Sequence, residues 1–93
     1  MFYMNKVIES AETYNAALAN WRRVPCEEHA ARVKYDKAYL DGIVDISATL
    51  GIYLTFTYNG LGFITSVSNE SKGHKPYTAK VTGAINIGDR FSR

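Results

Sequence analysis

Residues 52–68 alternate between apolar and polar side chains on both sides of an Asn-Gly pair, Asn59-Gly60. Alternation with a period of two is the pattern of a β-strand that buries one face. Asn-Gly is strongly preferred in two-residue type I′ turns, because both residues tolerate a positive φ. The pattern therefore predicts a β-hairpin with strands over about 52–58 and 61–68.

A two-residue turn at Asn59-Gly60 also fixes the register of this hairpin. Tyr58 then pairs with Leu61 and Phe56 with Phe63, and we expect both phenylalanines to be buried. The predicted core face is almost entirely apolar or aromatic: Ile52, Leu54, Phe56, Tyr58, Leu61, Phe63, Thr65 and Val67. The other face is mostly polar: Tyr53, Thr55, Thr57, Ile64, Ser66 and Ser68.

A third strand is predicted over about 77–87, where alternation resumes after the polar stretch 69–76. Gly83 lies within this segment and predicts a bend, because glycine in a strand often marks a local kink. The polar stretch has no apolar anchor and is predicted to be a loop.

The first part of the chain has helical periodicity, with apolar side chains three and four residues apart. One such stripe predicts a helix over about 6–23: Val7, Ala11, Tyr14, Leu18 and Trp21. Asn5 is the expected N-cap, and Pro25 is expected to end this helix and open the next one.

A second helix is predicted over about 25–50, with Gly51 just beyond its C-terminus. Past Tyr39 the apolar positions broaden over two faces: Leu40, Ile43, Val44, Ile46 and Leu50. We therefore expect this half to be buried on both sides, against the first helix and the sheet. Gly42 is interpreted as a site of close packing.

These elements predict an α+β fold, in which a helical hairpin packs on a three-stranded antiparallel β-meander in the order α-α-β-β-β. The 93 residues suit a single domain spanning 1–93. Hydrophobic residues at 46% and charged residues at 22% are typical of a soluble globular protein.

Charge excludes two classes of function. A net charge of +2 is incompatible with mimicry of the DNA phosphate backbone, and it is too small for binding duplex DNA by charge alone.

No apolar run approaches the roughly 20 residues of a membrane span, and the first ten residues lack the pattern of a secretory signal. The single cysteine fits a reducing compartment. We therefore expect a cytoplasmic protein without a membrane partner.

Cys26 and His29 form the best candidate catalytic pair, because a helix N-terminus lowers a thiol pKa and a histidine can act as base. Glu27 and Glu28 oppose a thiolate, however, and no third orienting group is evident. We interpret Cys26 as a partly buried structural thiol.

Metal binding is disfavoured because His74 is remote from the Cys26–His29 pair in sequence. The sequence predicts a non-enzyme with no catalytic residues, cofactor, metal or small-molecule substrate.

A basic group surrounds the connection between the helices, with Trp21 and Tyr35 interleaved: Arg22, Arg23, Arg32, Lys34 and Lys37. A smaller group follows the hairpin: Lys72, His74 and Lys75. Such charges often serve only solubility. The functional alternative is that Arg22 and Arg23 bind phosphate or an acidic protein surface through bidentate contacts. The hydroxyl-rich outer face of the sheet is a further, weaker candidate surface.

From MFYMNKVIESAETYNAALANWRRVP to INIGDRFSR, the chain resembles small phage-encoded anti-CRISPR proteins directed at a type I-F RNA-guided surveillance complex. The resemblance rests on size, a solitary domain and the absence of enzyme motifs. It implies an inhibitor in the host bacterial cytoplasm that binds Cas protein subunits, with CRISPR RNA as an optional contact, and blocks target DNA recognition. The basic group is then the partner-binding site. The alternatives are a small nucleic-acid-binding module and a structural or assembly protein of a phage.

Overall fold

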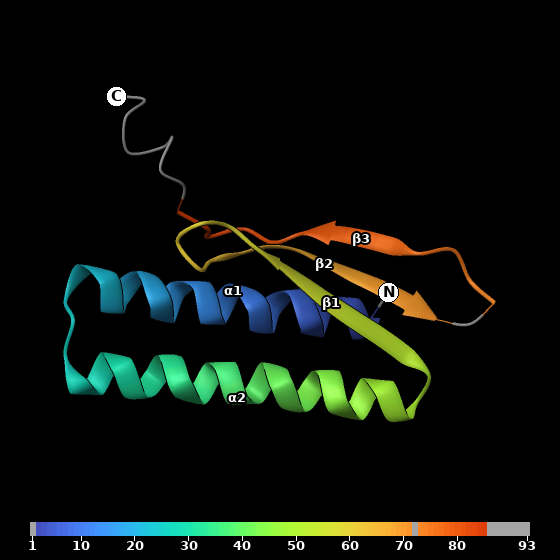
Figure 1. The fold of residues 1–93 in the computed structure, drawn as a ribbon, viewed down its shortest axis with the longest axis horizontal. Coiled ribbons are helices and arrows are strands. Elements are labelled where there is room, and N and C mark those ends of the chain that lie inside the picture. Colours follow the sequence, from blue (N-terminus) through green and yellow to red (C-terminus); the bar gives the residue numbers. More distant parts are fainter. Residues whose placement is uncertain (1, 72, 86–93) are drawn as a thin grey trace.

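The computed structural model describes residues 2–71 and 73–85, and its two helices precede a three-stranded antiparallel sheet (Figure 1). The elements are α1 (Phe2–Arg23), α2 (Glu27–Thr49), β1 (Ile52–Tyr58), β2 (Ile64–Ser71) and β3 (Tyr77–Lys80). The strands are ordered β1-β2-β3. The predicted α+β fold with the order α-α-β-β-β is confirmed.

Helix α1 lies at the centre of the packing, since it contacts both α2 and β2, while α2 reaches the sheet through β1. The buried core draws on both helices, the three strands and the segments that flank the sheet: Met4, Val7, Ala11, Tyr14, Leu18, Leu40, Leu54, Phe63, Ile64, Val67, Ala79 and Val81. The stripe predicted for the first helix is therefore buried, apart from Trp21, which is 36% exposed.

The helix ends differ from the predicted ones by one turn or less. Helix α1 includes Asn5, which is therefore not its N-cap, and the additional first turn buries Met4 in the core. Pro25 precedes α2, and Cys26 is the N-cap residue, with extended backbone angles. Gly51 follows the helix with a φ of 81°, the left-handed conformation expected just beyond a helix C-terminus.

The hairpin between β1 and β2 forms, but the predicted turn and register are wrong. Phe56 pairs with Val67, and the chain reverses through a loop over 59–63. Gly62 has the positive φ of 91°, whereas Asn59 and Gly60 do not, so no type I′ turn exists. The Asn59 side-chain Oδ1 accepts hydrogen bonds from the backbone N–H groups of Leu61 and Phe63, at 2.9 and 3.1 Å. This side-chain bonding favours the wider loop over a two-residue turn.

The wider loop shifts the second strand to 64–71 in place of the predicted 61–68. A bulge follows, because Thr57 pairs with Ser66 while Tyr58 pairs with Ile64, which leaves Thr65 as the extra residue. The bulge turns Ile64 into the core, where it is fully buried, although the alternation placed it on the polar face. Phe63 is also fully buried, and Phe56 is partly buried against the core.

The third strand ends at Lys80, earlier than the predicted limit near 87, although Val81 continues the pairing with a 3.0 Å bond to the Thr65 carbonyl. Two side chains of helix α1 then form hydrogen bonds with the segment that follows β3. The Asn15 Nδ2 donates to the Thr82 carbonyl at 2.9 Å, and the Thr82 hydroxyl donates to Glu12 at 2.8 Å. Gly83 has a φ of 87°, so the predicted bend is present. Residues 86 and 87 of the predicted strand lie outside the described residues.

The C-terminal half of α2 is buried on one side only, which corrects the expectation of burial on both sides. Leu40 is in the core, and Ile43 and Val44 are partly buried, whereas Ile46 and Leu50 are exposed. The reason is that the sheet covers α1 and reaches α2 only through β1 (Figure 1). The opposite side of α2 is uncovered by the described residues.

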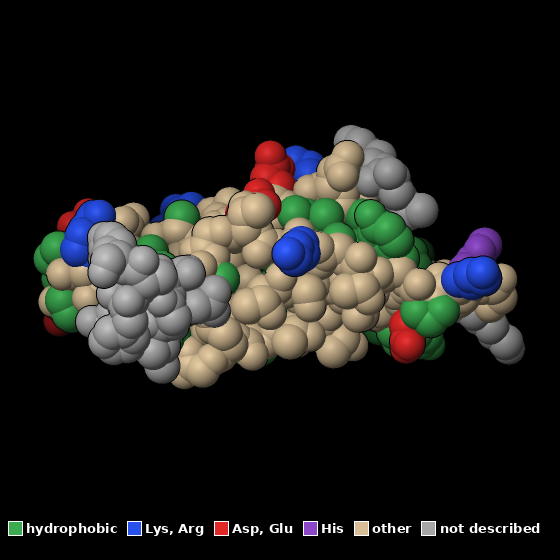
Figure 2. All heavy atoms as spheres, turned by 90° about the horizontal axis from the view of Figure 1, so that it is seen from above, with side chains coloured by type: hydrophobic (Ala, Val, Ile, Leu, Met, Phe, Trp, Pro, Cys, Tyr) green, Lys and Arg blue, Asp and Glu red, His purple; other side chains and the backbone are tan. Residues whose placement is uncertain are grey.

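The outer face of the sheet consists mainly of uncharged polar side chains and backbone (Figure 2). Thr55, Ser68 and Thr78 lie side by side across the three strands, and the Ser68 and Thr78 hydroxyls are 3.2 Å apart. The predicted polar face is thus confirmed for these positions.

Asn15 provides the first test of this fold. Its fully buried amide bonds the Ile64 N–H, the Ile64 carbonyl and the Thr82 carbonyl, at 2.8, 2.9 and 2.9 Å. Asn15→Leu keeps the branching and the number of side-chain heavy atoms but leaves these groups unpaired, so we expect the free energy of unfolding to fall by about 3–5 kcal/mol. The exposed control, Asn5→Leu, should change it by less than about 0.5 kcal/mol. Urea denaturation measures both, and a loss below about 1 kcal/mol for Asn15→Leu would contradict this account.

Ser47 provides a test in the opposite direction. Its side chain in α2 is fully buried, and its hydroxyl has no hydrogen-bond partner in the described part of the chain. An unsatisfied buried hydroxyl destabilises the folded state, so Ser47→Ala should raise the free energy of unfolding by about 0.5–2 kcal/mol. Ser10→Ala in α1 isolates the gain in helix propensity alone. The explanation fails if Ser47→Ala stabilises no more than Ser10→Ala in thermal denaturation.

Candidate basic interface

Arg22 and Arg23 are exposed in the last turn of α1, where positive charge is favoured by the helix dipole. Within the described part of the chain, neither guanidinium has a carboxylate partner. Arg23 donates a 3.2 Å hydrogen bond to the side-chain oxygen of Asn20, one turn earlier. Both arginines therefore retain donors for an external acceptor.

A hollow of about 420 Å³ lies beside these arginines, and its other walls are Ala19, Leu61 and Ile85. Helix α1, the 59–63 loop and the segment after β3 thus meet at this end of the molecule. The Asn59 Nδ2 donates a 2.8 Å bond to the Ile85 carbonyl, which joins the loop to that segment. The result is an apolar floor with two guanidinium groups at its edge.

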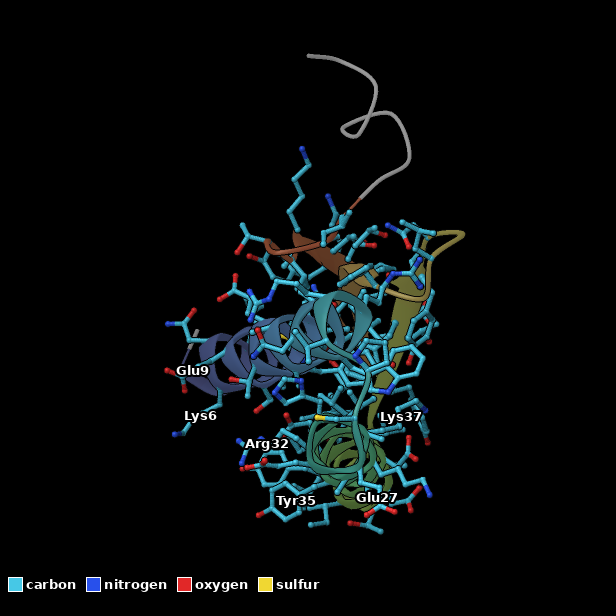
Figure 3. The ribbon with its side chains drawn as sticks, turned by 90° about the vertical axis from the view of Figure 1, so that its left-hand side faces the viewer. Lys6, Glu9, Glu27, Arg32, Tyr35 and Lys37 are labelled. Atoms are coloured by element: carbon cyan, nitrogen blue, oxygen red, sulfur yellow. The ribbon has the colours of Figure 1, made fainter. Side chains whose placement is uncertain are left out.

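Lys37 lies on the same side of the helical hairpin as β1 (Figure 3). Its ammonium group is 3.4 Å from the Asp41 carboxylate in an exposed pair along α2, which contributes little to stability. Lys34 precedes Lys37 by three residues, a neighbouring position on a helix surface, and is exposed. Lys34 has no ion-pair partner among the described residues.

Two aromatic residues are coupled electrostatically to Lys37. Partial burial acts to lower the Lys37 pKa, but Tyr58 and then Asp41 outweigh it, so the pKa lies above its ordinary value. Burial, followed by Tyr58, raises the pKa of Tyr14. Lys37 is therefore a full positive charge at neutral pH and lies near the end of β1. We call Arg22, Arg23, Lys34 and Lys37 the basic end.

Arg32 is separated from the basic end. Figure 3 shows it on the opposite side of α2 from Lys37. Its Nε is 3.2 Å from the Asp36 carboxylate, which is 7% exposed, and its guanidinium lies 5.5 Å from the centre of the Tyr35 ring. These contacts hold Arg32 against its own helix, so the five residues predicted from the sequence do not form one surface.

Cys26 is exposed, which corrects its interpretation as a partly buried thiol. The reason is that it precedes the first turn of α2, at the connection between the helices, where no described residue covers it. His29 is not directed to the thiol, because its Nδ1 is hydrogen-bonded to the Val24 carbonyl at 2.8 Å. Among the described residues, no three His, Cys, Asp or Glu side chains gather as potential metal ligands.

The second basic group is only partly described. His74 and Lys75 are exposed in the connection between β2 and β3, and Lys72 lies outside the described residues. His74 and Lys75 also border a hollow of about 540 Å³, together with Ile52 and Tyr77. This group is at the other end of the sheet from the 59–63 loop (Figure 1). It is therefore distinct from the basic end.

Sequence reasoning missed the apolar half of the basic end. The assumption of a two-residue turn places Leu61 on the core face of the hairpin, and the alternation over 77–87 places Ile85 in the third strand. The available signal was Asn59, whose side chain competes for backbone bonds and favours a longer loop. Leu61 and Ile85 lie next to the arginines, and Asn59 bonds the backbone of both.

Comparison with known proteins found no matching family model, no similar curated protein and no similar solved structure. The functional argument therefore depends on the chain's own residues. Neither helix in the described part of the chain has the length and apolar character needed to cross a bilayer.

Cys26 offers a test of the α2 N-terminus. Its backbone has the extended N-cap conformation, but its side chain makes no capping bond. A serine hydroxyl accepts such a bond, so Cys26→Ser should raise the free energy of unfolding by about 0.5–2 kcal/mol. Cys26→Ala, the control without an acceptor, should stay within about 0.5 kcal/mol of the wild type. If thermal denaturation shows that Cys26→Ser is no more stable than Cys26→Ala, the assignment of Cys26 as the N-cap of α2 is wrong.

Proposed function

We propose that this protein is a non-enzymatic phage inhibitor that acts in the host bacterial cytoplasm. It binds Cas protein subunits of a type I-F-like RNA-guided surveillance complex and blocks recognition of target DNA. The basic end provides the charged contacts, and the adjoining hollow receives an apolar side chain of the partner.

One observation carries this proposal: Arg22 and Arg23, which have no carboxylate partner among the described residues, border a hollow walled by Ala19, Leu61 and Ile85. Arginine next to apolar surface is the composition of protein interfaces, where desolvated guanidinium groups supply much of the binding energy. Charges that serve only solubility need no such hollow.

The charge distribution favours a ribonucleoprotein over naked nucleic acid as the partner. Each phosphate neutralised requires its own Lys or Arg, and the net charge of the chain is only +2. Lys37 is already paired with Asp41, which leaves three basic side chains at this end for phosphate. Guide RNA is therefore a secondary contact beside a protein surface.

Charge reversal of the arginine pair tests the proposal. Arg22→Glu with Arg23→Glu should weaken capture of a purified type I-F surveillance complex by about 2–5 kcal/mol, mainly through faster dissociation. It should lower the free energy of unfolding by no more than about 1 kcal/mol, because both side chains are exposed at a helix end. Biolayer interferometry measures the binding, and a DNA mobility shift measures inhibition.

Lys75→Glu with Lys80→Glu is the matched control, since it makes the same change in net charge at exposed positions away from the basic end. This control should bind and inhibit as the wild type does. Equal inhibition by the arginine variant would contradict the proposal. Tight, salt-sensitive binding of the wild type to free RNA or DNA would instead indicate a nucleic-acid-binding module.

A further inference from the structure

Helix α2 carries a second apolar face that no described residue covers. Its large side chains are strongly exposed: Tyr35 63%, Tyr39 55%, Ile46 64% and Leu50 68%. Tyr35, Tyr39, Gly42 and Ile46 follow one another at spacings of four, three and four, which is the spacing of a coiled-coil seam. We call Tyr35, Tyr39, Gly42, Ile46 and Leu50 the outer stripe.

The outer stripe is distinct from the face with which α2 joins the core. Leu40 and Ser47, which are fully buried, lie on the side that packs against α1 and β1. Tyr35 instead points away from α1 (Figure 3). Exposed apolar surface arranged in a continuous line is characteristic of an interaction site rather than of a solvated helix face.

Gly42 gives the outer stripe its shape. Apart from its own helix backbone and chain neighbours, a Cβ added at this position would meet no atom of the described residues within 4 Å, so none of them packs into the space above the glycine. Glycine within a helix is about 1 kcal/mol less favourable than alanine. Close packing against the described residues of a single copy does not offset this cost. The glycine therefore leaves a notch in the stripe, next to the protruding ring of Tyr39.

We propose that two copies of this chain associate through their outer stripes, with the α2 helices antiparallel about a two-fold axis. In this arrangement Tyr39 of each copy fills the notch at Gly42 of the second copy, and Tyr35 packs on Ile46 of the second copy. A two-fold interface requires a self-complementary surface, and a large side chain three residues from a notch provides one.

Charge next to the stripe favours the antiparallel direction. Lys34 and Asp45 are exposed on the same flank of α2, and neither has an ion-pair partner among the described residues. When two α2 helices run antiparallel, Lys34 of each copy lies beside Asp45 of the other, so the pair forms twice. In a parallel arrangement the two-fold axis would place these residues of the two copies on opposite sides of the seam, so neither pair could form.

Sedimentation equilibrium of the full chain tests the association. We expect the wild type to show a monomer–dimer equilibrium between micromolar and millimolar concentrations. Ile46→Glu places a charge in the seam and should weaken the dimer at least about tenfold, because such central apolar contacts carry most of the binding energy. Ala48→Glu, an exposed position off the stripe in the same turn, is the matched control and should dimerise as the wild type does.

A charge swap tests the direction of the helices. Lys34→Asp alone and Asp45→Lys alone should each weaken the dimer about fivefold at low salt, and the double variant should restore wild-type association. These positions are exposed and unpaired in one copy, so circular dichroism should show unchanged folding. A wild type that remains monomeric throughout, an Ile46→Glu variant that dimerises normally, or a double swap that fails to restore association would each overturn the proposal.

Discussion

The amide of Asn15 holds the two halves of this protein together. It lies in the middle of α1, is fully buried, and makes three hydrogen bonds to the backbone of Ile64 and Thr82. The start of β2 and the segment after β3 are thereby attached to one point on the helix. Gly83 follows closely, and a Cβ there would lie 3.4 Å from the Asn15 side chain. The end of the sheet and the position of Ile85 thus depend on one buried side chain.

This attachment determines which surfaces are left for partners. The sheet is held against α1, so α2 packs mainly against α1 and β1, and no described residue covers its outer side. The same attachment brings the segment at Ile85 to the 59–63 loop, and so creates the hollow beside Arg22 and Arg23. The molecule therefore has two surfaces of different chemistry, one basic and partly apolar, the other apolar and self-complementary. An antiparallel pair of α2 helices would place the two basic ends at opposite ends of a dimer.

No family model, curated protein or solved structure matches this chain, so its proposed function rests on surface chemistry and on the resemblance. In the proposed function, the class of partner comes from the resemblance to anti-CRISPR proteins, and the arginine pair beside an apolar hollow is the proposed contact. Arg32 does not belong to that surface, because Asp36 and Tyr35 hold it on the other side of α2.

The sequence by itself determined the order of elements, the buried stripe of α1, the glycine stop at Gly51 and the polar outer face of the sheet, because periodicity and backbone preference are local properties. It did not determine the register of the hairpin, since Asn59 bonds the backbone at Leu61 and Phe63 and widens the loop. It also did not determine which apolar face of α2 is buried. Two faces had suitable side chains, and only the position of the sheet on α1 decided between them. That choice depends on contacts between residues far apart in the chain, such as Asn15 with Thr82, which no local pattern encodes.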